Sequence, residues 1–245
     1  MRSLIKINLI RLYKNTFYIV ACILAFIITY WFMTVKPIPQ LANKEPLVSA
    51  ILLSSGIVFF FSIFAGLFFG NEREDGIIRN KLIAGHSMLT IYFSQYITLC
   101  IAMLIMMVFW LVGAIVAGMP INSDTILYTL IAILFNAATL SIIESVVIRV
   151  KKQIIGVLAS MFIIYIFLQS VFVGNFLNMI TYENKVANTI VVVIYNISSI
   201  GQCFARSGMG DPEINNTFIQ IMVSVIVMVI SFLLGTMKLS KTEIN

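Results

Sequence analysis

Six long apolar runs, separated by short polar or charged segments, set the pattern of the chain. They cover residues 17–35, 48–70, 88–118, 125–147, 154–174 and 217–237. Each is about twenty residues or longer, the length at which an α-helix crosses the roughly 30 Å hydrocarbon core of a bilayer. None alternates polar and apolar residues as the strands of a membrane β-barrel would. The pattern predicts an all-α integral membrane protein with six spans in a single transmembrane domain, residues 1–245.

Residues 1–16 precede the first run and mix basic with apolar side chains. At roughly 100° per residue, Ile5, Leu9, Leu12 and Tyr13 fall on one side of a helix. This arrangement predicts an interfacial helix that lies along the membrane surface. The alternative is a helix that simply extends the first span.

The longest segment between runs, residues 175–216, contains an apolar stretch at 186–200. About fifteen residues of helix reach roughly 22 Å, which is short of the roughly 30 Å needed for a crossing. We therefore expect short helices that dip into the outer leaflet, or lie on it, before the last span. A seventh span is the alternative.

Composition agrees with a membrane location. Hydrophobic residues make up 60% of the chain and charged residues only 11%, whereas about a quarter of a soluble domain is charged. The mean hydropathy is +1.03. Charges recur through Arg11 and Lys14, and no small-residue cleavage site follows the first run, so we expect this run to be retained as a span.

Basic residues are distributed unevenly between the segments that join the runs. The net charge of +6 raises the possibility of a nucleic-acid partner, but the Lys and Arg residues sit at the ends of spans, where they orient membrane proteins. With a cytoplasmic N-terminus, four of the 16 basic residues fall outside and the other twelve inside. The four outer residues are Lys36, Lys44, Lys185 and Arg206. This bias predicts that both termini are cytoplasmic, and it explains the basic residues better than a nucleic-acid partner does, so we expect none.

Residues 72–86, between the second and third runs, combine charges with apolar side chains. Asp75 is expected to cap a helix that starts at Gly76, and Gly85 to end it. Apolar residues surround most of this helix, although a surface helix in water should keep a polar face. We infer contacts on two sides, with the bundle and with a partner, the latter ringed by polar groups such as Glu72. The alternative is an ordinary turn packed on the membrane surface.

The order Glu72, Gly76, a basic and apolar helix, and then Gly85 is a recognisable motif between two spans. It resembles the permease subunits of type-2 ATP-binding-cassette (ABC) exporters, which carry Glu, then Gly-Thr, then a basic and apolar helix that ends near Gly. Ile77 stands here where Thr is common. The resemblance extends to the whole layout, including Gly201-Gln202, a pair that often occurs before the last span of these permeases.

The resemblance implies that residues 72–86 form a coupling helix that seats in a separate ABC ATPase subunit. Its Ile78 and Leu82 would anchor the contact, while Arg79 and Lys81 would meet acidic groups. The full set that the resemblance assigns to this contact is Glu72, Asp75, Gly76, Ile77, Ile78, Arg79, Lys81, Leu82 and Ile83. ATP and Mg²⁺ would be bound by the ATPase, and a second permease subunit, identical or different, would complete the transporter.

Within the family, the chain looks most like permeases of Gram-positive bacteria that export amphipathic peptides or give self-protection against bacteriocins. This likeness implies a bacterial cell membrane and an amphipathic or hydrophobic cargo, such as a peptide toxin or an antimicrobial peptide. A drug or antibiotic exporter of the same family is the alternative. A scaffold without transport activity is a further possibility.

The chain itself lacks the motifs of an enzyme. No Gly-x-x-x-x-Gly-Lys-Ser/Thr phosphate-binding loop is present, so ATP hydrolysis would require a partner. His86 is the one histidine, which argues against a metal site and against an intramembrane metalloprotease. The three cysteines do not form a disulfide framework. We expect no catalytic residue, metal or cofactor in this chain.

Glu144 is the one acidic residue inside an apolar run, about five residues before Arg149. An ion pair with Arg149 or Lys151 at the membrane edge is one interpretation, and a role in gating is the other. Carboxylates within spans are also typical of ion-coupled secondary transporters, which is the alternative outside the exporter class.

In this family the second and fifth spans would line the transport path. The polar and aromatic residues that we expect there are Ser55, Phe59, Ser62, Tyr165 and Gln169. Such a lining has almost no charge and suits an amphipathic cargo. The alternative for each of these side chains is ordinary packing against lipid and neighbouring helices.

Overall fold

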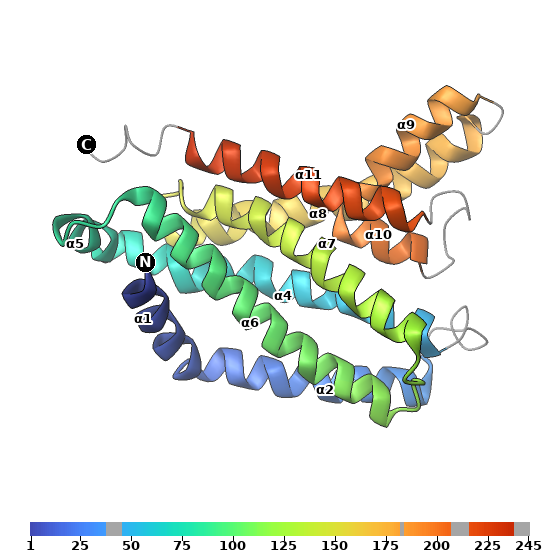
Figure 1. Ribbon diagram of the computed structural model, residues 1–245, viewed down its shortest axis with the longest axis horizontal. Helices are drawn as coiled ribbons and strands as arrows, with labels where there is room; N and C mark the ends of the chain where they lie inside the picture. Colours follow the sequence, from blue (N-terminus) through green and yellow to red (C-terminus); the bar gives the residue numbers. More distant parts are fainter. Residues whose placement is uncertain (38–45, 182–183, 207–215, 238–245) are drawn as a thin grey trace.

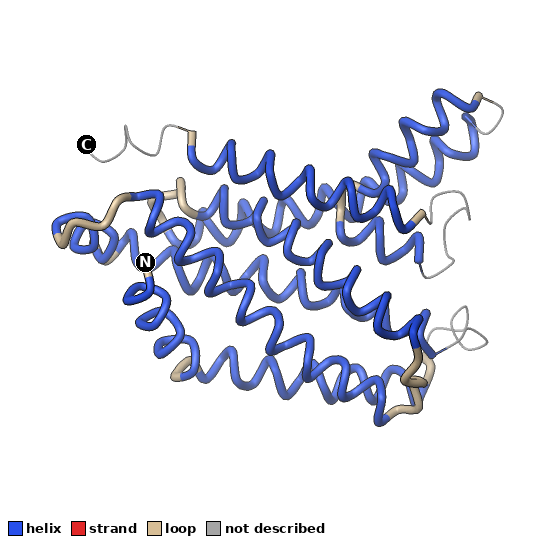
Figure 2. Tube along the Cα trace, in the orientation of Figure 1, coloured by secondary structure: helices blue, strands red, loops and turns tan. Residues whose placement is uncertain are grey.

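The computed structural model describes residues 1–37, 46–181, 184–206 and 216–237, and every regular element in these ranges is an α-helix (Figure 2). Six of the described helices are long and apolar enough to cross a membrane (Figure 1). These six are α2 (Thr16–Val35), α4 (Pro46–Glu74), α6 (Met88–Val116), α7 (Ser123–Val147), α8 (Gln153–Thr181) and α11 (Thr217–Thr236). The predicted all-α, multi-pass membrane protein is therefore confirmed at this level.

The observed helices follow the predicted runs closely, with two extensions. α4 continues four residues past the predicted end at Gly70, so that Glu72 lies on the helix and not in a connecting loop. α8 reaches Thr181, because apolar residues such as Phe176 and Ile180 prolong the pattern. The first part of the predicted outer segment is thus a continuation of the fifth apolar helix. Each of these 29-residue helices is about 43 Å long, more than the roughly 30 Å hydrocarbon core.

α4 lies at the centre of the bundle and packs against α8, α7, α6, α10 and α2. α11 packs along α7, and α2 packs along α6. α11 and α2 therefore flank the bundle. The core between them is rich in Phe from α4 and Met from α6, including Phe61, Phe64, Met103 and Met106. Small residues permit close approach where α4 meets α8, since a side chain on Gly66 would collide with the backbone of Val157.

α1 (Arg2–Tyr13) is a separate helix, not an extension of α2. The two are divided at Lys14 and Asn15, and the Asn15 side chain caps α2 by accepting a hydrogen bond from the Tyr18 backbone N–H. The prediction that Ile5, Leu9, Leu12 and Tyr13 form the covered face of α1 is wrong in detail. Leu4, Asn8 and Leu12 are buried, whereas Tyr13 is exposed, because packing against α6 selects the side of the helix that is covered.

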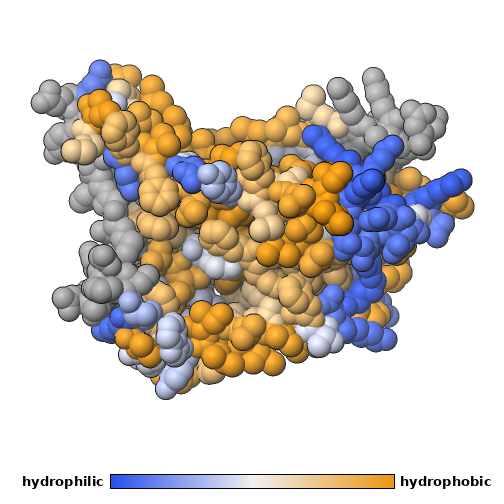
Figure 3. Space-filling model, turned by 180° about the vertical axis from the view of Figure 1, so that it is seen from behind, coloured by the Kyte–Doolittle hydropathy of each residue, from blue (hydrophilic) through white to orange (hydrophobic). Residues whose placement is uncertain are grey.

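Charged side chains gather at one end of the molecule. α1 and the short helix α5 (Ile77–Ile83) lie at this end, which we call the α5 end (Figure 1). Figure 3 shows the hydrophilic surface at this end beside a broad hydrophobic surface over the helices. The exposed charged residues of the segments that meet here are Arg2, Lys6, Lys14, Glu74, Asp75, Arg79, Arg149, Lys151 and Lys152.

The opposite end carries the two short helices α9 (Lys185–Asn196) and α10 (Ser199–Arg206). They meet at a bend of 112°, so the apolar stretch 186–200 is not one straight helix. Such a pair is either a broken span or a re-entrant loop. If it is one span, the number of spans rises from six to seven. The expectation of short helices before the last span is met by these two elements.

Candidate functional site

The predicted coupling segment folds as α5, a two-turn helix between α4 and α6. Its N-cap is Gly76, in the left-handed region at φ 72°, and no side chain caps it. The predicted capping by Asp75 is therefore wrong. The reason is that α4 runs on to Glu74, so the chain must reverse within two residues, which a glycine with positive φ permits. Gly85, at φ 85°, ends the helix as expected.

α5 has one covered side and one open side. Ile78 is buried in a cluster with Leu4, Met88 and Ile91, and Leu82 packs against the same cluster. These two residues, which were predicted to anchor a partner, instead anchor α5 to its own bundle. Ile83 is 76% exposed. Three polar or small residues, Arg79, Asn80 and Ala84, are exposed beside it, while Ile77 is half-buried.

Glu72 is the centre of this site. Its side chain is fully buried, with 0% exposure, and is not one of the polar residues at the rim of the segment. Its carboxylate pairs with the Arg11 guanidinium through Oε1 and with the Lys81 ammonium through Oε2, the latter at 2.6 Å. The Gln95 side-chain N–H₂ donates to Oε2 at 2.9 Å. One carboxylate therefore joins α4 to α1, α5 and α6.

Charge balance at Glu72 follows from these contacts. Two cations and one amide surround one buried carboxylate, and a buried charge is tolerated only when it is paired and hydrogen-bonded. Arg11 also lies over the Phe68 ring, 4.9 Å from its centroid, and so is held from two directions. The four helices at this end are thus tied through a single side chain, and a displacement of α5 would be transmitted to α1 and α6.

Sequence reasoning missed Arg11 and Gln95. Arg11 was counted only as an orienting charge, and nothing local marks it as the partner of a residue 61 positions away. Gln95 could have been identified from the sequence, because it is a polar side chain within an apolar run. It lies one turn after Ile91, on the face of the helix that is buried. Polar residues inside spans usually face the bundle interior.

Glu144 is the second fully buried carboxyl, on α7 near the α5 end. Neither carboxyl oxygen has a hydrogen-bond partner among the described residues. The structure does not bring Arg149 to it: Arg149 is exposed and its guanidinium donates to the Met237 carbonyl at 3.4 Å. Lys151 is also exposed. The ion pair that was considered for Glu144 is not present.

The residues predicted to line a transport path do not form one cluster. Ser62 is buried and donates to the carbonyl of Phe59, and Ser55 donates to that of Leu52, so both hydroxyls are satisfied within α4. Phe59 is exposed on α4, and Tyr165 and Gln169 are exposed on α8. These three side chains face the outside of this single chain.

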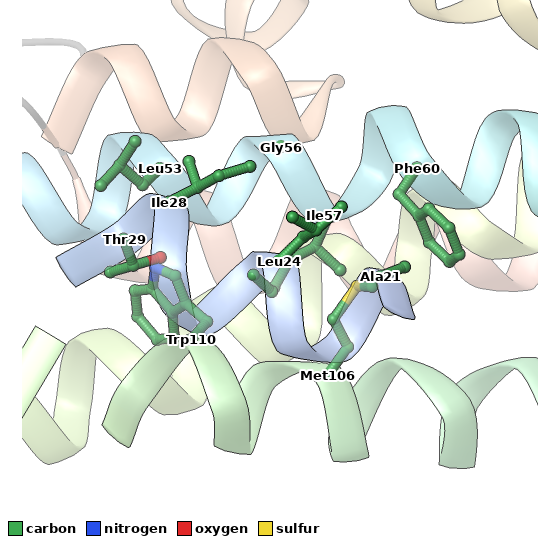
Figure 4. Close-up of a pocket in the computed structure, with 11 residues that line it drawn as sticks. Ala21, Leu24, Ile28, Thr29, Leu53, Gly56, Ile57, Phe60, Met106 and Trp110 are labelled. Atoms are coloured by element: carbon green, nitrogen blue, oxygen red, sulfur yellow. The ribbon is translucent and has the colours of Figure 1, made fainter. Parts of the chain in front are cut away.

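A separate apolar pocket lies between α2, α4 and α6, with a volume of about 260 Å³ (Figure 4). Leu24 and Ile28 of α2, Phe60 of α4 and Met106 of α6 are among its lining residues, and Gly56 leaves space on the α4 side. Thr29 and the Trp110 N–H are its polar groups, and the latter donates to the Ala50 carbonyl. The pocket offers no cluster of polar groups for chemistry.

At the opposite end, Gln202 of α10 organises a buried network without charge. Its side-chain N–H₂ donates to the Asn196 carbonyl at 2.6 Å and to the Ser224 hydroxyl of α11 at 3.1 Å. Gln220 of α11 donates to the Asn196 side chain at 3.2 Å. Gly201 is required here, since a Cβ on it would lie 2.0 Å from the Tyr195 carbonyl oxygen. The Gly201-Gln202 pair thus fixes the bend between α9 and α10.

No family model, curated protein or solved structure matches this chain. Functional inference therefore depends on the geometry of the sites. Among the described residues, no group of three or more His, Cys, Asp or Glu side chains is arranged to hold a metal ion. The α5 end, with the ion pairs of the buried Glu72 and the exposed Ile83 of α5, is the candidate functional site.

Proposed function

We propose that this chain is the transmembrane permease subunit of an ATP-driven exporter, and that α5 is the helix on which a separate ATPase subunit docks. One observation carries the proposal: α5 is clamped on its inner side, yet it presents Ile83 to the outside at 76% exposure next to the exposed Arg79. A large apolar side chain beside a cation, on a helix that is held to the bundle at the charged end of the molecule, suits a partner with an apolar groove and acidic groups.

The ion pairs of Glu72 support a mechanical role for α5. A motor that closes on α5 needs that helix to be fixed to the spans, since a freely hinged helix would move alone. Lys81 and Ile78 provide this connection, to Glu72 of α4 and to the apolar cluster with α1 and α6. In this proposal the partner contact narrows from the nine residues expected from sequence to the open side of α5.

The remaining parts of the proposal follow from the resemblance of the sequence to the permease subunits of type-2 ABC exporters. The ATPase would bind ATP and Mg²⁺, a second permease copy or a related permease would pack beside the exposed residues of α4 and α8, and the α5 end would face the cytoplasm of a bacterial cell. The cargo would be an amphipathic or hydrophobic molecule, a peptide toxin or antimicrobial peptide, with a lipophilic drug as the alternative. The exposed Phe59, Tyr165 and Gln169 would then face the cargo path.

The test is docking of an ABC ATPase, which the proposal expects to be encoded beside this chain. Ile83→Asp is expected to reduce co-purification of that ATPase at least tenfold, because an unpaired carboxylate would enter an apolar contact. Ile121→Asp is the matched control, since Ile121 is 73% exposed and lies in the connection between α6 and α7 at the opposite end. Unchanged ATPase recovery with Ile83→Asp would refute the docking role of α5, leaving a turn packed on the membrane surface.

An ion-coupled secondary transporter is the second candidate, and Glu144 is the observation that favours it. A carboxyl buried within a span is typical of proton- and cation-driven carriers. Measurements of export from intact cells would distinguish an ATP-driven exporter from an ion-coupled carrier. Export that stops on ATP depletion at a constant proton gradient supports the exporter, whereas export that stops only when the gradient is collapsed supports the carrier.

A further inference from the structure

Glu144 is surrounded by groups that do not stabilise a negative charge. Its carboxyl is fully buried and lacks hydrogen-bond partners among the described residues. α7 packs against α4, α6, α8, α10 and α11, and three of these, α6, α8 and α11, contain no Asp, Glu, Lys or Arg. α10 lies at the opposite end, and its Arg206 donates to the Thr217 hydroxyl.

The charged groups of α4 and of the end of α7 are already engaged. Glu72 is itself an acid and is already paired with Arg11 and Lys81, so α4 offers Glu144 no counter-charge there. Arg73 donates to the Ile148 carbonyl, and Arg149 is exposed and donates to the Met237 carbonyl. The titratable side chains of α6 are Tyr92, Tyr96 and Cys100, and none of them is a cation.

A second unsatisfied group lies on α6, which packs against α7. The Tyr92 hydroxyl is buried and has no partner among the described residues. It lies against Gly235 of α11, where an added Cβ would sit 2.4 Å from the hydroxyl oxygen and 3.3 Å from the Cβ of Ser145. α6 and α11 therefore meet α7 closely at Ser145, the residue that follows Glu144. A separation of these helices is the change that would open the site.

We propose that Glu144 is a proton-binding site of the bundle, neutral while α6, α7 and α11 are packed together. Burial of an ionised carboxylate without partners is strongly unfavourable, so the sealed site holds the carboxylic acid. When the helices separate, the O–H bond breaks, the proton passes to water and the carboxylate is left within reach of solvent. This site is independent of whether a separate ATPase drives transport, because it concerns the packing of this chain alone.

The test is infrared spectroscopy of the purified full-length protein in lipid nanodiscs at neutral pH, in which the spectrum of each variant is subtracted from that of the wild type. We expect the carbonyl-stretch band of a protonated carboxyl, lost in Glu144→Gln and retained in Asp124→Asn, which changes an exposed carboxyl on the same helix. Gly235→Ala should weaken the band, because the added methyl group props the helices apart. Folding of each variant is checked by size-exclusion chromatography and circular dichroism.

Two results would overturn the proposal. The first is a protonated-carboxyl band that is absent in the wild type or unchanged in Glu144→Gln. The second is a band that disappears when choline chloride is replaced by sodium chloride at constant pH, which would assign the site to a metal cation instead of a proton. Neither result bears on ATPase docking at Ile83, so failure of this proposal is distinguishable from failure of the exporter proposal.

Discussion

Two fully buried carboxyls lie near each other at the α5 end, and their surroundings are opposite. Glu72 receives Arg11, Lys81 and Gln95, while Glu144 has no partner among the described residues. The exposed fraction of each is 0%, so burial does not distinguish them. The difference teaches that the charge of a buried acid is decided by its partners: Glu72 is suited to a permanent charge that ties helices, and Glu144 to a neutral form.

The comparison is tested most strongly by replacing each carboxyl group with an amide of the same shape. Glu72→Gln is expected to lower the free energy of unfolding by about 3–5 kcal/mol, because Arg11 and Lys81 lose their counter-charge in a poorly solvated site. Glu144→Gln should change it by less than about 1 kcal/mol, since an amide replaces a neutral acid of the same shape. Reversible denaturation in mixed micelles measures both. Equal losses would contradict the distinction between the two sites.

The two cations at Glu72 are expected to differ in importance. The Lys81 side chain is 10% exposed and that of Arg11 is 35% exposed, so water replaces Glu72 more readily at Arg11. Lys81→Met should cost about 2 kcal/mol of unfolding free energy, and Arg11→Met about 1 kcal/mol. The same denaturation assay applies. A larger loss in Arg11→Met would show that α1, and not α5, is the main element held by Glu72.

Two buried tyrosines extend the comparison at a smaller scale. The Tyr18 hydroxyl donates to the Ala102 carbonyl at 2.7 Å, whereas the Tyr92 hydroxyl, beside Gly235, has no partner in the described part of the chain. Tyr18→Phe should therefore cost about 1 kcal/mol, and Tyr92→Phe less than about 0.5 kcal/mol. Each variant serves as the control for the other. A clear loss in Tyr92→Phe would indicate that its hydroxyl is hydrogen-bonded in the membrane.

The sequence by itself determined the six apolar helices and the short helix between the second and third. Apolar runs of this length have one solution in lipid, because a helix satisfies its backbone hydrogen bonds internally and needs no distant partner. Gly85 marked the end of α5 for a similar local reason, since glycine adopts a positive φ without strain. These features depend on neighbouring residues only.

Only the tertiary structure decided which polar groups meet. Arg11 and Glu72 are 61 residues apart, and no local pattern pairs them. The sequence favoured Arg149 for Glu144 because the two are close along the chain, but the fold turns Arg149 outward and leaves Glu144 fully buried. Likewise, α5 is apolar on most sides, and its packing chose Ile78 for the bundle and left Ile83 outside. Pairing and burial are set by how helices distant in sequence pack, and that packing is not encoded in any single segment.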